Sequence, residues 1–234
     1  MQIPKIFHYI WLGTKEMHPL MLAWRRKWAT LHPDWEVKVW REDLDLPAHC
    51  LVCGDEIVEC RYPEYLASCP TYAKRSDVWR YEILDQQGGV YMDTDFEPVK
   101  NIESLIANLP AFAGLCDTRY GWDEQNPKGF IKTEVACSIM GAAVHHQWLR
   151  ELVAGVPLQD PKDPLSLAFP YLTEITSRHA DVHVFPQKTF YPVTWDVYAL
   201  GGKRSLVKEK LSDETFAVHR WSSCWFPEGL KVRI

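Results

Sequence analysis

The sequence predicts an α/β domain in which helices flank a mainly parallel sheet, and three observations lead to this prediction. Short apolar stretches alternate with stretches of helical periodicity, which is typical of strands joined by crossover helices. The 234 residues, 47% of them hydrophobic, can bury a sizeable core and are too few for two comfortable domains. Neither an internal repeat nor a Gly/Ser-rich linker divides the chain, so we expect a single domain over residues 1–234.

The chain begins with a predicted strand, helix and strand. A short apolar stretch predicts a buried strand that ends at residues 11–13. Pro19 opens a helix whose apolar residues recur every three or four positions, and Pro33 closes it. Residues 35–40 alternate apolar and polar side chains, as a strand with one buried face does. Residues 44–70 fit no element clearly.

The central stretch joins a helix directly to a strand. Residues 71–87 have helical periodicity, and Gly88 and Gly89 end the helix. Residues 90–92 then form a short strand that leads to Asp93. Further strands are expected at residues 111–115, 135–140, 182–185 and 215–219, and further helices at 144–153 and 164–179.

Composition excludes several classes of protein. A charged fraction of 24% excludes a disordered chain, and the absence of a long apolar run argues against a transmembrane segment. The first residues do not resemble a signal peptide. A formal net charge of -5 argues against a nucleic-acid partner, because phosphate contacts need clustered Lys and Arg.

The cysteines suit a reducing compartment. Their number, seven, is odd, and they form no regular framework, so we expect a cytoplasmic protein. Four of them lie close together after His49, namely Cys50, Cys53, Cys60 and Cys69. A zinc site would show two tight pairs, whereas only Cys50 and Cys53 are paired. Metal binding and free thiols both remain open for this Cys50–Cys69 cluster.

The strongest functional signal is the acidic pair that follows the strand at residues 90–92. Asp93 and Asp95 stand at i and i+2 and point to the crevice where α/β folds bind ligands. Their oxygens suit Mg²⁺ or Mn²⁺. An EF-hand loop is excluded because Pro98 replaces the required Gly, and Glu97 disfavours an aspartyl phosphatase.

A second pair lies on the preceding helix. Asp77 and Arg80 share one face with the apolar Ala73 and Leu84. They form either a surface ion pair of little energetic value or a site in which Arg80 meets a phosphate or sugar oxygen and Asp77 accepts from sugar hydroxyls. The spacing does not choose between these readings.

Five segments resemble one known family in order along the chain. They are residues 3–13 (IPKIFHYIWLG), 73–81 (AKRSDVWRY), 88–95 (GGVYMDTD), 190–192 (FYP) and 219–225 (HRWSSCW). They resemble glycosyltransferase family 32, the DXD-containing sugar transferases, and the central block is also similar to the large clostridial glucosylating toxins. The resemblance implies a GT-A, Rossmann-like fold, a nucleotide-sugar donor (a UDP- or GDP-sugar), Mn²⁺ or Mg²⁺, and retention of anomeric configuration.

The resemblance also assigns roles to residues. It implies donor binding by Trp11, Asp77, Arg80, Asp93 and Trp225, metal binding by Asp93, Asp95 and His219, and catalytic roles for Asp93, Asp95 and Arg80. Trp11 would stack on the base, and Trp225 would close over the diphosphate. The family usually has Ser before the last Trp, where this chain has Cys224; this puts that diphosphate contact in doubt without excluding it, because Ser222 and Ser223 are nearby.

Retention needs either a carboxylate nucleophile or attack from the same face. The sequence singles out no nucleophile among Asp117, Asp123, Glu124, Glu134 and Asp196. We therefore expect same-face attack, in which the leaving phosphate helps to deprotonate the acceptor hydroxyl.

The other aromatic residues of interest divide by position. Trp24, Trp28, Trp35 and Trp40 stand at helix or strand spacing and are expected in the core. Trp122 and Trp195 lie in loop-like stretches and are candidates for an acceptor pocket. Tyr91 and Phe96, which flank the acidic pair, are expected to serve packing.

The resulting expectation is a metal-dependent glycosyltransferase with a glycan or glycolipid acceptor. The resemblance implies surface polysaccharide assembly (capsule or lipopolysaccharide), in the cytoplasm or peripherally at the inner face of the membrane. Two alternatives stay open: a metal-dependent nucleotide-sugar hydrolase, and a non-catalytic carbohydrate-binding module.

Overall fold

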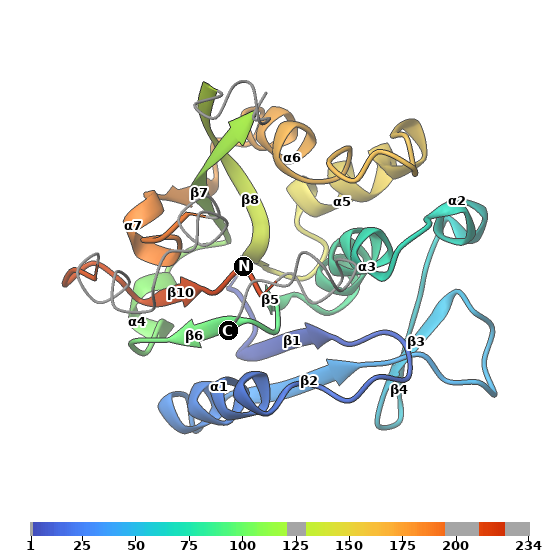
Figure 1. Ribbon diagram of the computed structural model, residues 1–234, viewed down its shortest axis with the longest axis horizontal. Helices are drawn as coiled ribbons and strands as arrows, with labels where there is room; N and C mark the ends of the chain where they lie inside the picture. Colours follow the sequence, from blue (N-terminus) through green and yellow to red (C-terminus); the bar gives the residue numbers. More distant parts are fainter. Residues whose placement is uncertain (1, 121–129, 195–210, 223–234) are drawn as a thin grey trace, which may run out of the picture.

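The computed structural model describes residues 2–120, 130–194 and 211–222 (Figure 1). At its centre is a six-stranded sheet with the order β2-β1-β5-β8-β7-β9. The strands are β1 (Ile6–Ile10), β2 (Glu36–Trp40), β5 (Gly89–Met92), β7 (Ala111–Tyr120), β8 (Phe130–Ala142) and β9 (Val182–Phe185). β1 runs parallel to β2 and β5, β7 runs parallel to β9, and β8 is antiparallel to both of its neighbours. The predicted mainly parallel α/β sheet is therefore confirmed, with β8 as its one reversed strand.

Helices cover both faces of this sheet. They are α1 (Pro19–Leu31), α2 (Pro63–Ser68), α3 (Tyr72–Gln87), α4 (Glu103–Ile106), α5 (Gln147–Gly155), α6 (Phe169–Thr176) and α7 (Gln187–Phe190), with a 3₁₀ turn at Val156–Leu158. One core cluster joins the sheet to α3, α5 and α6, and the other joins it to α1, α4 and α7. Tyr91 belongs to the first cluster, and Val90 and Met92 belong to the second, as alternation along a strand requires. None of the described helices is long and apolar enough to cross a membrane.

Two small antiparallel sheets complete the fold. β3 (Cys50–Cys53) pairs with β4 (Glu56–Glu59), in the stretch that the sequence left unassigned. β6 (Phe96–Pro98) pairs with β10 (Ala217–His219), so a segment near the end of the chain lies directly beside the acidic pair.

The corner between α3 and β5 positions the acidic pair. Gly88 has φ +64° and Gly89 has φ +89°, conformations that favour glycine. A Cβ on Gly88 would come within 2.9 Å of the Pro4 ring and the Val144 nitrogen, and one on Gly89 within 2.8 Å of the Ile6 carbonyl. The two glycines thus let α3 turn tightly into β5 against the first strand.

Most predicted elements are present, and several differ in extent, among them the helix predicted at 144–153, which is α5 (Gln147–Gly155), and the strand predicted at 215–219, which is β10 (Ala217–His219). The helix predicted at 164–179 is α6, Phe169–Thr176 only; residues 164–168 form turns instead, where the Asp163 carboxylate accepts from the Leu165 nitrogen. The strands predicted at 111–115 and 135–140 extend into a longer hairpin. Cross-strand pairs such as Asp117 with Thr133 continue that ladder beyond the apolar residues.

Candidate active site

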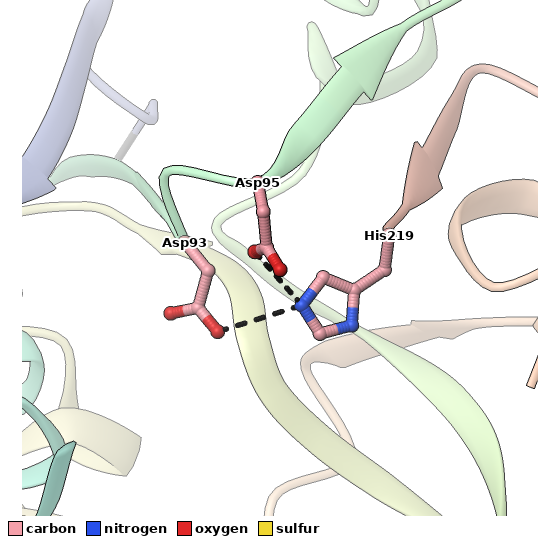
Figure 2. Close-up of side chains that lie close together, drawn as sticks. All are labelled: Asp93, Asp95 and His219. Carbon is pink, nitrogen blue, oxygen red and sulfur yellow. Dashed lines mark hydrogen bonds and ion pairs between the residues drawn. The ribbon is translucent and has the colours of Figure 1, made fainter. Parts of the chain in front are cut away.

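Asp93 and Asp95 lie in the turn between β5 and β6, at the carboxyl end of β5. The backbone N–H of Asp93 donates to the Ser138 carbonyl of β8 over 2.8 Å, which fixes the turn to the sheet. β10 pairs with β6 and places His219 opposite Phe96. Figure 2 shows the imidazole pointing toward both carboxylates: its Nε2 lies 3.1 Å from Asp95 Oδ1 and 3.7 Å from Asp93 Oδ2. The structure thus brings together three residues that are far apart in the sequence.

Asp95 is the more tightly held carboxylate of the pair. Its Oδ1 faces His219, and its Oδ2 accepts from the backbone N–H of Ser222 over 2.7 Å. Burial alone would raise the pKa of this carboxyl, but the hydrogen bonds and the charge of His219 outweigh burial and lower the pKa to about 2. The side chain is therefore ionised at any ordinary pH.

Aromatic rings fix the orientation of His219. Its ring stacks on Phe96 with centroids 4.7 Å apart, Trp221 covers it at 4.1 Å, and Tyr191 meets it edge-on. Trp221 has φ +50°, which is rare for a non-glycine residue. This turn carries the next residue, Ser222, to the point where its N–H reaches the DXD carboxylate.

Arg80 connects α3 to the acidic pair. The guanidinium is buried, donates to the Cys137 carbonyl over 2.8 Å, lies 2.7 Å from Asp77 Oδ1, and lies 3.7 Å from Asp93 Oδ1. Asp77 and Arg80 do form an ion pair, but its predicted place at the surface is wrong, because both side chains are buried beside the site. Burial raises the pKa of the Asp77 carboxyl to about 6, although Arg80 and Lys74 favour its ionised form.

Tyr91 does more than the packing that we expected from the sequence. Its hydroxyl donates to Asp93 Oδ1 over 2.6 Å, and the Arg80 guanidinium lies 4.8 Å from the centre of its ring. The signal that could have found it is strand alternation, because Tyr91 stands two residues before Asp93. Sequence reasoning also missed Ser222, whose contribution is a backbone N–H and leaves no trace in residue type.

Trp11 is the first residue after β1 and does not belong to the strand. Its indole N–H donates to the Lys15 carbonyl over 2.6 Å, and its ring packs on the small cluster of Met17, Met21 and Trp24. The residue as a whole is partly exposed. Its predicted stacking on a nucleotide base stays a prediction.

Several predicted residues lie outside the described part of the chain. These are Trp122, Asp123, Glu124, Trp195, Asp196, Cys224 and Trp225. Of the nucleophile candidates that are described, Asp117 accepts from the Thr133 hydroxyl at 2.6 Å, and the buried Glu134 pairs with Lys132 at 2.7 Å. Both stand on the β7–β8 hairpin, and each already has a side-chain partner there.

The group formed by Asp93, Asp95 and His219 has the chemistry of a cation site. One ligand atom from each lies within 4.8 Å of the others, and it is the one such His/Cys/Asp/Glu group that the described residues form. Two carboxylates and an imidazole suit a hard or borderline divalent cation such as Mg²⁺ or Mn²⁺. In the Cys50–Cys69 cluster, three thiols are buried, and the four cysteines, all of which the structure describes, do not come together as such a group.

Comparisons of the sequence identify a known region and its relatives. Residues 21–111 match the model of the glycosyltransferase sugar-binding region containing DXD motif. Inositol phosphoceramide mannosyltransferase 3 of Schizosaccharomyces pombe is 28% identical over 178 residues, which are 75% of this chain and 42% of that protein. Mannosyl phosphorylinositol ceramide synthase SUR1 of Saccharomyces cerevisiae is 31% identical over 113 residues, 47% of this chain and 27% of that protein. The chain thus spans less than half the length of these curated relatives.

Comparison of the structure identifies the fold. The galactosyltransferase LgtC, solved with donor and acceptor sugar analogs, superposes with a TM-score of 0.50 over 92% of this chain and 86% of its own, at 10% identity. A second LgtC structure, of an active-site mutant, gives 0.50 over 96% and 92%, at 12% identity. The chain therefore has the GT-A fold of these glycosyltransferases, and its residues 21–111 match the DXD-motif sugar-binding region, in agreement with the resemblance seen in its sequence.

Proposed function

We propose that this protein is a retaining glycosyltransferase that moves a hexosyl unit from a nucleotide-sugar donor to a glycolipid or glycan acceptor, with a divalent cation. One observation carries the proposal: Asp93, Asp95 and His219 converge at the carboxyl end of β5, within a chain whose residues 21–111 match the DXD sugar-binding region. This end of the sheet is where open α/β folds bind ligands.

The three converging side chains would hold the cation. Mn²⁺ or Mg²⁺ bound there would neutralise the charge that develops on the departing diphosphate. Asp95 is suited to this task because its low pKa keeps it ionised. A net charge of -5 makes such local compensation necessary for an anionic donor.

The sugar would lie against α3, beside Asp77 and Arg80. Arg80 already contacts Asp77 Oδ1 and the Cys137 carbonyl, so its first effect is to hold Asp77 and Asp93 in place. Asp77 would accept from sugar hydroxyls, and Trp11 would stack on the base, a contact of roughly 1–3 kcal/mol on the scale of base–aromatic stacking.

Same-face attack is the route to retention that we propose, although three of the five candidate nucleophiles, Asp123, Glu124 and Asp196, lie outside the described residues. Of the candidate nucleophiles, Asp117 and Glu134 are engaged by Thr133 and Lys132 on the β7–β8 hairpin. A leaving phosphate oxygen can take the proton of the acceptor hydroxyl without any enzyme carboxylate. Trapping of a covalent glycosyl-enzyme on one of these carboxylates would contradict this mechanism.

The acceptor that we propose is a lipid with a phosphoinositol headgroup. The support is that the relatives described above are named for inositol phosphoceramide. Such an acceptor would place the enzyme at a membrane surface, and we propose the inner, cytoplasmic face. Assembly of capsule or lipopolysaccharide, which the resemblance implied, stays a prediction.

One assay separates transfer from the two alternatives. The full chain is incubated with UDP- and GDP-hexoses, with Mn²⁺ or with EDTA, and with or without a phosphoinositol lipid, while release of nucleoside diphosphate is recorded. Transfer predicts metal-dependent release that rises with the acceptor and a product of unchanged anomeric configuration by NMR. Release that ignores every acceptor would indicate a hydrolase, and binding without turnover would indicate a carbohydrate-binding module.

A further inference from the structure

Lys74 is a buried cation beside the site that no role above explains. It stands on α3 one turn before Asp77, and only 2% of its surface is exposed. Its Nζ donates to the Ser166 hydroxyl over 2.7 Å, and the described residues offer the other two N–H groups of an ammonium no further hydrogen bond. Because a buried ammonium is costly unless its hydrogen bonds are made, the remaining donors call for acceptors.

Asp77 has an unused hydrogen-bond acceptor close to Lys74. Its Oδ1 is taken by Arg80, whereas its Oδ2 has no hydrogen bond to any described residue, and 11% of the side chain is exposed. Residues three apart on a helix are neighbours, and the Lys74 ammonium and the Asp77 carboxylate interact electrostatically. An unfilled donor therefore lies next to an unfilled acceptor.

This combination suits a hydroxyl group better than any other ligand group. An ammonium only donates, a carboxylate only accepts, and a hydroxyl does both, so one sugar hydroxyl can satisfy the two side chains together. We propose that Lys74 and Asp77 jointly bind one hydroxyl of the transferred sugar, and that Lys74 thereby sets the selectivity for hexoses over deoxy-hexoses. The inference rests on the proposed glycosyltransferase function and specifies its donor site.

The position of Lys74 along α3 fits this task. Lys74, Asp77, Arg80 and Asp93 form a row of alternating charge that ends at the DXD turn. Lys74 and Arg80 are six residues apart, so the row extends about 9 Å along the helix. A hexose whose diphosphate lies at the DXD turn would run along this row, with the hydroxyls farthest from the anomeric carbon nearest to Lys74.

The structural alternative is that the hydrogen bond from Lys74 to Ser166 serves only to hold the turns before α6 against α3. Ser166 belongs to the turns before α6, and its hydroxyl also donates to the Asp160 carbonyl over 2.5 Å. A tie of this kind would support the site as a whole and would not distinguish one sugar from another. The two readings therefore differ in selectivity.

The test compares three variants on a set of donors. Lys74→Met keeps the length of the side chain and removes its donors, Ser166→Ala removes the tie to the loop, and Lys162→Met replaces an exposed lysine of the same loop. The donors are the nucleotide hexose that the wild type uses best and its monodeoxy analogues on the same nucleotide. The measured quantity is the ratio of kcat/KM for the hexose to that for each analogue.

We expect the wild type to favour the hexose over one analogue by at least about tenfold, and Lys74→Met to lower that ratio by at least about tenfold. Ser166→Ala and Lys162→Met should keep the wild-type ratio. A uniform loss of activity in Lys74→Met with every ratio preserved would overturn the inference, as would the same change of ratio in Ser166→Ala. Should Lys74→Met fail to fold by thermal melting, Lys74→Leu, which also lacks donors, must show the lowered ratio.

The outcomes for the inference and for the proposed function are distinguishable. A wild type that turns over a nucleotide sugar while Lys74 variants keep every ratio would refute the role of Lys74 alone. A wild type that neither binds nor turns over any nucleotide sugar would refute both.

Discussion

Asp93 and Asp95 differ in how firmly the fold holds them. Asp95 is buried and accepts from His219 and Ser222, whereas Asp93 is more exposed and depends on Tyr91 and Arg80 for its orientation. Of the two proposed carboxylate ligands, Asp95 is therefore the more firmly held, and Asp93 depends on hydrogen bonding and charge from neighbouring side chains. Substitutions at the two positions should have different consequences.

Removing the fixed carboxylate should abolish turnover. Asp95→Ala is expected to lower kcat by at least about a hundredfold, because the site loses its buried charge and a carboxylate that would hold the divalent cation together with His219. Titration of the protein with Mn²⁺, followed by calorimetry, should show weaker binding. Asp34→Ala, which removes an exposed carboxylate, is the control and should change neither quantity. Undiminished activity in Asp95→Ala would overturn the metal assignment.

Removing the hydrogen bond that orients Asp93 should lower kcat less than removing the Asp95 carboxylate does. Tyr91→Phe keeps the ring under Arg80 and removes only the hydroxyl that donates to Asp93. We expect a loss of about tenfold in kcat and of about 1 kcal/mol in the free energy of unfolding. Tyr171→Phe removes a similar buried hydrogen bond, to the Leu152 carbonyl at 2.6 Å, and should lower stability alone. Equal kcat losses in both variants would show that Tyr91 has no special role at Asp93.

The candidate site was predictable where residue type carries the chemistry. Asp93 and Asp95 stand out by pattern, and the resemblance added His219. The burial of Asp77 and Arg80 was not predictable, because it depends on how β8 covers α3. Ser222 acts through its backbone, and the turn at Trp221 that directs it is a conformation that sequence patterns do not reveal.

At the scale of elements, local signals predicted the strands and helices well, and tertiary contacts decided their lengths. α3 has a Thr71 side chain that accepts from the Lys74 nitrogen at its start and Gly88 at its end, and its bounds match the prediction. The sequence predicted both strands of the β7–β8 hairpin but not their full length, because the outer part pairs polar residues without an apolar alternation. The reversed direction of β8 likewise follows from this hairpin and not from any local pattern.

The glycine corner between α3 and β5 allows a test that distinguishes the cost of a positive φ from the cost of a steric clash. Gly88→Ala would place a Cβ within 2.9 Å of Pro4 and the Val144 nitrogen, at φ +64°. Gly54→Ala has nearly the same φ, +59°, with nothing within 4 Å of the added atom. We expect Gly54→Ala to cost about 1 kcal/mol in the free energy of unfolding, from conformation alone. Gly88→Ala should cost clearly more, because the corner must also move.

The measurement for both glycine variants is urea unfolding at neutral pH, with activity as a second readout. Gly88→Ala should also lower kcat, because the displaced corner carries Asp93 with it, whereas Gly54→Ala should not. Equal free-energy losses in the two variants would mean that the corner tolerates the side chain. The close contacts would then not be what requires glycine at this position.

At the scale of the whole molecule, buried neutral histidines connect elements that are distant in sequence. His8 of β1 accepts from the Trp40 indole of β2 at 3.0 Å and lies 2.8 Å from the Gly88 carbonyl at the α3–β5 corner. Burial lowers the pKa of His8 to about 3 and also lowers those of His32 and His146. The two strands β1 and β2 and the α3–β5 corner, which leads to the DXD turn, therefore meet around a neutral imidazole.

This arrangement predicts a pH dependence of stability with a definite sign. Between about pH 6.5 and pH 3, the unfolded chain protonates His8 while the folded protein does not, so stability falls as pH falls, by about 1.4 kcal/mol per pH unit. The stabilisation is fully present above pH 6.5. Asp77 acts in the opposite sense, because its raised pKa of about 6 lets the folded protein bind a proton first. The contribution of His8 must therefore be isolated with a variant.

His8→Gln isolates it, since an amide can accept from Trp40 and donate to the Gly88 carbonyl without titrating. Urea unfolding of the wild type and the variant between pH 7 and pH 4.5 gives two stability curves, and Asp77 contributes equally to both. Their difference should change by about 1.4 kcal/mol per pH unit below pH 6.5, in favour of the variant as pH falls. His183→Gln, an exposed position on β9, should leave the wild-type curve unchanged in shape. Parallel curves for wild type and His8→Gln would mean that His8 takes up its proton in the folded protein as readily as in the unfolded chain, and the β1–β2–corner junction would then tolerate a charge that its burial should forbid.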